Sequence, residues 1–110
     1  MNFFKTWFKK RKPSGFRYKK IQFISSLADA PKDLGSTIFI VKNGGNEKWV
    51  VFKCPDNCGN RVEVNLMKSK NPHWSLQMRR KKISLSPSVA VKGCNSHFWL
   101  IDSQVDWAKH

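Results

Sequence analysis

The stretch CPDNCG, residues 54–59, decides the expected fold together with the stretch GCNSHFW, residues 93–99. The chain has three cysteines: Cys54 and Cys58 lie in the first stretch, and Cys94 lies in the second, three residues before His97. Structural zinc sites take four thiolate or imidazole ligands in a tetrahedron, and Cys54 and Cys58 have an acceptable ligand spacing. We therefore expect Cys54, Cys58, Cys94 and His97 to bind Zn²⁺ and to hold two distant loops together.

Two other interpretations of the cysteines remain open: a disulfide between Cys54 and Cys58, or three inert buried thiols. A disulfide would leave Cys94 unpaired, and the N-terminal residues lack the apolar core of a secretory signal. A histidine beside aromatic residues is commonly a core residue, but its spacing from Cys94 favours a ligand. Zinc is therefore the preferred interpretation.

The charge of the chain is strongly positive. It contains 21 lysines and arginines against 7 acidic residues, a formal net charge of +14 in 110 residues. Residues 1–20 contain no acid, so much of the excess belongs to the N-terminal part. Charge of this sign attracts nucleic acid, anionic lipid or an acidic protein partner without choosing among them. The length predicts one small domain, residues 16–110, preceded by a basic arm, residues 1–15.

The arm has an amphipathic pattern. Phe3, Phe4, Trp7 and Phe8 share one face of a predicted helix, and lysines lie on other faces. The apolar segment is far shorter than the roughly 20 residues that span a bilayer. We expect a cytoplasmic protein whose residues 3–12 either dock on a membrane surface or a partner, or fold back as a short helix or tail.

Short alternating segments predict a mainly β domain of antiparallel hairpins stapled by zinc. One helical turn is expected within residues 25–31, a hairpin turn at residues 43–46, and an interruption at the SPS sequence of residues 86–88. The expected strands cover residues 16–24, 37–42, 48–53, 61–67, 74–78, 83–85, 98–101 and 104–107.

The basic sequence RRKK, residues 79–82, falls at a predicted hairpin tip. Together with five tryptophans it is compatible with nucleic-acid binding, in which cations meet phosphates and aromatic rings stack on bases. Hairpin tips collect lysine for solubility, however, and the tryptophans in strand patterns are explained by core packing. A solvated tip is the simpler interpretation.

Several short motifs occur in a fixed order along the chain. They are CPDNCG at residues 54–59, PHWSL at 72–76, LSPSV at 85–89, GCNSHFWL at 93–100 and VDW at 105–107. On these motifs the chain resembles a bacterial family catalogued as domain of unknown function 6527. The resemblance covers approximately residues 37–107 and implies a zinc-binding β domain. It also implies genes located beside those of ubiquitin-like modifiers, and a peptidase role toward these modifiers.

The chain departs from that family at Asp56, where members often carry a further cysteine. Three arrangements follow from this difference. Asp56 and the three cysteines hold a structural metal, which frees His97 to act as a general base toward Ser86, Ser88 or Ser96. Alternatively, water is the fourth ligand and is assisted by His97 or Asp56. In the third, His97 completes a closed site without chemistry.

The function expected from the resemblance is a peptidase that processes or deconjugates a ubiquitin-like modifier in a bacterial conjugation pathway. The catalytic candidates are His97, Ser88 and Ser86. A modifier would present an extended C-terminal tail, which an exposed sheet edge could accept as an added strand. The alternative is a non-catalytic zinc module that docks through residues 3–12 and 79–82 on nucleic acid, a membrane or another protein.

Overall fold

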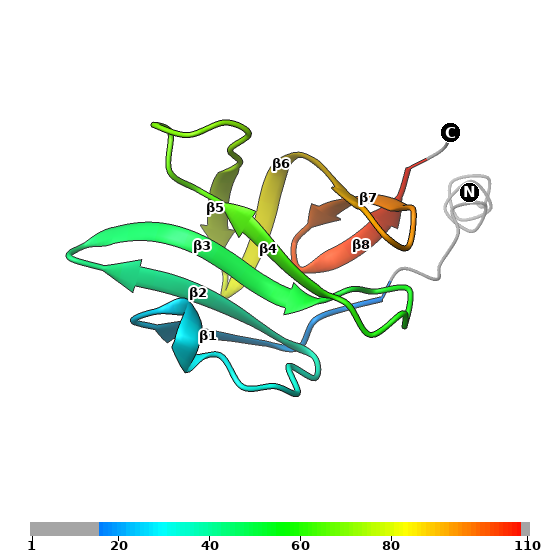
Figure 1. Ribbon diagram of the computed structural model, residues 1–110, viewed down its shortest axis with the longest axis horizontal. Helices are drawn as coiled ribbons and strands as arrows, with labels where there is room; N and C mark the ends of the chain where they lie inside the picture. Colours follow the sequence, from blue (N-terminus) through cyan, green and yellow to red (C-terminus); the bar gives the residue numbers. More distant parts are fainter. Residues whose placement is uncertain (1–15, 109–110) are drawn as a thin grey trace, which may run out of the picture.

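The computed structural model describes residues 16–108, so the predicted arm at residues 1–15 lies outside the described residues. The described chain forms eight strands and one short 3₁₀ helix (Figure 1). The elements are β1 (Lys20–Ile24), η1 (Leu27–Asp29), β2 (Thr37–Asn43), β3 (Asn46–Lys53), β4 (Arg61–Asn65), β5 (Ser75–Arg79), β6 (Lys82–Val91), β7 (Ser96–Ile101) and β8 (Gln104–Trp107). The prediction of a mainly β domain is confirmed. Within residues 16–108, no helix is long and apolar enough to span a membrane.

The strands form two four-stranded sheets, with the orders β1-β2-β3-β4 and β5-β6-β7-β8. All neighbouring strands within the sheets are antiparallel except β1 and β2, which are parallel with Lys20 opposite Thr37. The parallel β1–β2 pair is the exception to the predicted antiparallel hairpins. The connection through η1 returns the chain to the starting end of β1, so β2 runs in the same direction.

The β2–β3 hairpin confirms the predicted turn. Asn43 and Asn46 are paired, and Gly44 and Gly45 have φ values of 62° and 83°. A two-residue hairpin loop of this kind requires positive φ at both positions, which glycine adopts without strain. Strand β3 then runs to Lys53 and brings Cys54 to the end of the sheet.

Strand β6 differs from the prediction, because residues 86–88 do not end it. It continues to Val91, and its register with β7 shifts between Leu85 and Val89. The shift is a bulge, the one place inside a sheet where a proline such as Pro87 is readily accommodated. On its other side β6 pairs with β5 up to Ser86, which lies opposite Ser75.

Residues 16–19 connect the two sheets on one side. The Tyr18 amide donates to the Ser103 carbonyl at 2.9 Å, and the Lys19 amide donates to the Ser36 carbonyl at 2.8 Å. The sequence predicts that these residues belong to the first strand, but they cross from the start of β8 to β2 before β1 begins. Elsewhere, the Trp74 amide donates to the Asn65 carbonyl at 2.8 Å and joins β4 to the start of β5.

The main core lies between the sheets. Aromatic rings meet edge to face from Tyr18 to Phe52, from Phe52 to Phe98 and from Phe98 to Trp107, with centroids 5.3, 6.2 and 5.8 Å apart. Phe16 and Phe23 lie outside this core, because 37% and 49% of their surfaces are exposed. Phe23 lies on β1, which is an edge strand, and the Lys42 Nζ lies over its ring, 5.6 Å from the centroid.

Candidate active site and metal centre

Four side chains converge where the β3–β4 connection meets the β6–β7 turn. The ligand atoms of Cys54, Asp56, Cys58 and Cys94 all lie within 4.8 Å of one another. The Sγ atoms of Cys54 and Cys94 are 3.5 Å apart. A tetrahedral zinc ion with Zn–S bonds of about 2.3 Å needs ligand atoms roughly 3.8 Å apart. The number, type and spacing of these donors therefore fit one metal ion.

The β3–β4 connection is shaped by its own side chains. Asp56 Oδ1 accepts a hydrogen bond from the Cys58 amide at 2.9 Å, an Asx turn that folds the loop back toward Cys54. Asn57 and Gly59 have φ values of 70° and 85°, which asparagine and glycine tolerate better than other residues. The Cys54 amide donates to the Asn60 carbonyl at 2.9 Å and closes the loop.

Ser96, one of the candidate serines, lies at the metal centre. Its hydroxyl donates a very short hydrogen bond to Asp56 Oδ2, and its Oγ is 3.6 Å from Cys94 Sγ. Hydrogen bonds from Ser96 and then Cys58 hold the pKa of the Asp56 carboxyl well below its usual range. Asp56 is therefore a carboxylate at neutral pH and offers a negatively charged oxygen to a cation.

The thiols differ in their environment. Burial raises the pKa of the Cys54 thiol to about 12, whereas hydrogen bonding from Cys58 lowers the pKa of Cys94. Metal ligation needs thiolates, so a cation bound here must displace the proton of Cys54.

A second arrangement lies on the solvent-facing side of the β5–β8 sheet. Ser88 Oγ is 2.8 Å from His97 Nε2. Ser88 lies within the β6 bulge, between Leu85 and Val89, and His97 lies on β7 opposite Ala90. Their chain neighbours Val89 and Phe98 are buried, so the alternation along each strand turns Ser88 and His97 to the opposite face. With its proton on Nδ1, His97 accepts the hydroxyl proton of Ser88 at Nε2.

Trp74 fixes the backbone at Ser88. Its indole Nε1 donates to the Ser88 carbonyl at 3.1 Å, while its own amide is bonded to β4. Both Ser88 and His97 are half-buried. The serine is therefore held by the bulge and by the indole, and it remains accessible to a substrate.

The structure separates the predicted site residues into two groups. Cys54, Cys58 and Cys94 come together with Asp56, the alternative fourth ligand, whereas His97 is placed beside Ser88. Ser86 lies at the start of the bulge, opposite Ser75 of β5.

Asp106 was not among the predicted site residues. It lies opposite Trp99 in the β7–β8 ladder, which places it diagonally across from His97 on the same face of the sheet. The alternation of Val105, Asp106 and Trp107 predicts that Asp106 faces away from the core. The β7–β8 hairpin register, together with that pattern, is the signal that could have identified it.

Comparison with known proteins gives one result. No curated protein and no solved structure is significantly similar to this chain. A family model described as "Bacterial ubiquitination-like system serine protease (BubE)" matches residues 26–108, which include every strand from β2 to β8. This description agrees with the expected peptidase role in a ubiquitin-like system. The chain therefore belongs to the BubE family of serine proteases of bacterial ubiquitination-like systems.

Proposed function

We propose that this protein is a cytoplasmic serine peptidase that cleaves the peptide bond at the C-terminal tail of a ubiquitin-like modifier. Ser88 is the nucleophile and His97 is the general base. The observation that carries this proposal is the 2.8 Å separation of Ser88 Oγ and His97 Nε2 in a chain of this family. A nucleophile and a base within hydrogen-bonding distance are the minimum requirement for acyl transfer.

The proposed reaction has two halves. Ser88 Oγ attacks the carbonyl carbon of the scissile bond as its proton passes to His97 Nε2, and His97 then donates that proton to the leaving amine. An acyl ester on Ser88 remains. Water attacks the ester while His97 takes one proton from it, and the proton returns to Ser88 as the modifier leaves with a free carboxylate.

Asp106 is the residue best placed to orient His97. A carboxylate that accepts a hydrogen bond from Nδ1 selects the tautomer that leaves Nε2 free to accept a proton, and it stabilises the imidazolium. The strand register supports this role, because Asp106 and His97 share one face on adjacent strands.

Zinc is the metal that best suits the Cys54, Asp56, Cys58 and Cys94 donor set, and its role is structural. Three thiolates and a carboxylate would complete a closed tetrahedron. The ion would fix the turn that contains Cys94, three residues before His97. In this arrangement the metal supplies no reacting group, and the chemistry belongs to Ser88 and His97.

The test is cleavage of a ubiquitin-like protein of a bacterial ubiquitination-like system, carrying a C-terminal extension or joined to another protein. Ser88→Ala and His97→Ala should each lower kcat by at least about 1,000-fold. Ser86→Ala is the matched control, because it removes a neighbouring hydroxyl at the start of the bulge, and it should cleave at the wild-type rate. Loss of activity in Ser86→Ala with full activity in Ser88→Ala would contradict the assignment.

A second candidate function is a non-catalytic zinc module that docks by charge. The exposure of Arg79, Arg80, Lys81 and Lys82 at the β5–β6 turn favours it. Arg80 and Lys81 have positive φ, so Arg80→Asn with Lys81→Gly removes two charges and keeps the turn. If docking is the function, this variant should lose salt-sensitive binding to DNA or anionic vesicles, and the wild-type protein should not cleave the modifier.

A further inference from the structure

We propose that the seam between β4 and the C-terminal half of β6 binds the tail of the modifier as an extended strand. The seam is defined by residues 61–63 on one side and residues 88–90 on the other. This inference rests on the proposed function, because it supplies the substrate-binding groove for Ser88 and His97. It is carried by three observations: the backbone direction on each side and the cavity between them.

The backbone of β6 presents unpaired hydrogen-bonding groups to the seam. The Ala108 amide donates to the His97 carbonyl at 2.9 Å, so the backbone groups of His97 face β8. Ala90 lies opposite His97, and in an antiparallel ladder its N–H and C=O then point away from β7. Strand β5 does not reach this level, because its first residue, Ser75, lies opposite Ser86.

The backbone of β4 faces the seam in the same way. The Cys54 amide donates a hydrogen bond to the Asn60 carbonyl, and the Leu66 amide donates one to the Lys48 carbonyl, both at 2.9 Å. These bonds show that the even-numbered residues of this segment direct their backbone groups toward β3. The N–H and C=O groups of Arg61 and Glu63 therefore point to the free edge of β4.

One cavity joins these two edges. It has a volume of about 480 Å³ and is lined by residues 60–63 and 90–93. A second cavity of about 560 Å³ shares residues 90–92 and extends to His97. Figure 1 shows the start of β4 beside the β6–β7 turn that forms this lining. A strand in the seam could thus bond to both sheets and lead to the reacting pair.

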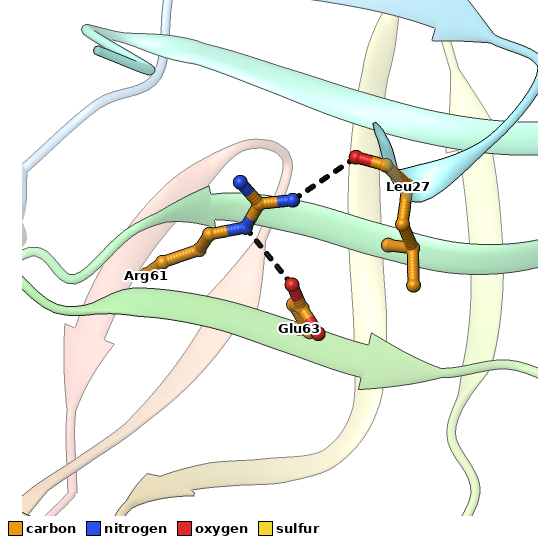
Figure 2. A network of polar contacts seen from close by, with 3 residues as sticks. All are labelled: Leu27, Arg61 and Glu63. Carbon is orange, nitrogen blue, oxygen red and sulfur yellow. Dashed lines mark hydrogen bonds and ion pairs between the residues drawn. The ribbon is translucent and has the colours of Figure 1, made fainter. Parts of the chain in front are cut away.

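The side chains leave the seam accessible. The Arg61 guanidinium turns to Glu63 Oε2 at 2.9 Å and to the Leu27 carbonyl at 3.1 Å, on the outer face of the first sheet (Figure 2). The β6 side contributes the small residues Ala90 and Gly93 and the exposed cation Lys92. Backbone recognition with one cation suits an extended, neutral or acidic peptide tail.

Trp74 closes one end of the seam. Its amide bonds to β4 and its indole bonds to the Ser88 carbonyl, so it bridges the two edges at the level of the nucleophile. A modifier tail must be extended to bring its peptide bond to Ser88, and the seam ends at that residue. The tail is therefore the occupant to which the seam is assigned.

The first test measures binding without cleavage. A fluorescein-labelled peptide that contains the C-terminal tail and extension of a ubiquitin-like protein of such a system is added to the Ser88→Ala variant. Amide hydrogen exchange should slow at Arg61, Glu63 and Ala90. Protection confined to the outer edges of β1 or β5, or the absence of any protection, would overturn the assignment.

The second test removes single hydrogen bonds. Ala90→Pro, made in the Ser88→Ala background, deletes an N–H that faces the seam and leaves the β7 ladder intact; it should weaken binding about tenfold. Met78→Pro is the matched control, because its N–H lies on the outer edge of β5, and it should bind like the parent. Equal binding by the Ala90 and Met78 variants would refute the seam.

Peptides N-methylated at one position each provide a readout that does not depend on the folding of a variant. Methylation at alternate residues should reduce binding to the Ser88→Ala protein, whereas uniform effects at all positions would reject strand pairing. The two proposals fail differently. A wild-type protein that binds the peptide in the seam but never cleaves it refutes the proposed function alone, and cleavage without seam protection refutes this inference alone.

Discussion

Asp56 has two roles, shaping the loop and offering a metal ligand, which a cysteine at the same position would not combine. Its Oδ1 accepts the Cys58 amide at 2.9 Å and shapes the loop, and its Oδ2 accepts the Ser96 hydroxyl. A carboxylate has enough lone pairs to shape the loop and also bind a cation. The residue thus shapes the loop and offers a hard oxygen ligand beside three soft sulfur ligands.

Asp56→Ala should therefore lower the affinity for zinc at least about tenfold, because it removes one of four ligands and the turn that orients Cys58. His97→Ala should bind zinc like the wild-type protein, since its Nε2 is beside Ser88. Competition with a chromophoric chelator measures both affinities, and Asp33→Ala is the control for loss of a surface carboxylate. Zinc loss in the His97 variant, with zinc retained in the Asp56 variant, would reverse the ligand assignment.

At the residue scale the sequence named the reacting groups but could not pair them. Ser86, Ser88 and Ser96 were all candidate partners of His97, and their separations along the chain could not show which hydroxyl reaches it. The β6 bulge and the strand register bring Ser88 to His97, while Ser96 turns to Asp56. A bulge depends on pairing between distant segments, so local sequence preferences do not predict its position.

At the scale of elements, residues 16–19 form a short segment that connects both sheets. Within them, Tyr18 donates its hydroxyl to the Lys53 carbonyl at 2.6 Å, one residue before Cys54. Burial, and then the charge of Cys54, raises the pKa of the Tyr18 phenol above its ordinary value of 10.0. The neutral phenol is therefore favoured in the folded state.

This shift predicts a specific alkaline instability. The contribution of Tyr18 is complete below about pH 10 and decreases as the pH rises further, because the phenol then ionises in the unfolded chain first. Tyr18→Phe should lose about 1 kcal/mol at neutral pH through the lost hydrogen bond, and its stability should fall less steeply above about pH 10. Urea unfolding over this pH range measures both effects. Parallel pH profiles for the two proteins would contradict the role of Tyr18.

Local signals predicted the hairpins and missed the pairings between distant segments. The glycines at the β2–β3 turn and the alternation in β4 correctly indicated local structure. The parallel pairing of β1 with β2 depends on the return of the chain through η1, and no local pattern contains it. The residues after Pro87 were not predicted as strand because proline usually ends one, but the bulge accommodates it.

For the whole molecule, the candidate metal-binding cluster lies where the two sheets meet at one end. Cys54, Asp56 and Cys58 follow β3 of the first sheet, and Cys94 lies in the β6–β7 turn of the second. Removing the ion should lower the free energy of unfolding by several kcal/mol, because the metal binds only the folded arrangement. Thermal unfolding with and without a chelator should show a lower midpoint after chelation, restored by added zinc.

Cys94→Ala provides the control for that measurement, since it should melt lower than the wild-type protein and respond little to the chelator. An unchanged midpoint for the chelated wild-type protein would show that the sheets are held together without a metal. The core between the sheets, with the connections through residues 16–19 and Trp74, would then hold them together.

The central claim is that Ser88, activated by His97, is the nucleophile of a serine peptidase. The most direct measurement is reaction of the whole protein with a fluorophosphonate probe, followed by mass spectrometry of its peptides. The account predicts one adduct on Ser88 that forms at the wild-type rate in Ser86→Ala and is strongly reduced in His97→Ala. An unlabelled Ser88, or an adduct that forms equally fast without His97, would contradict it.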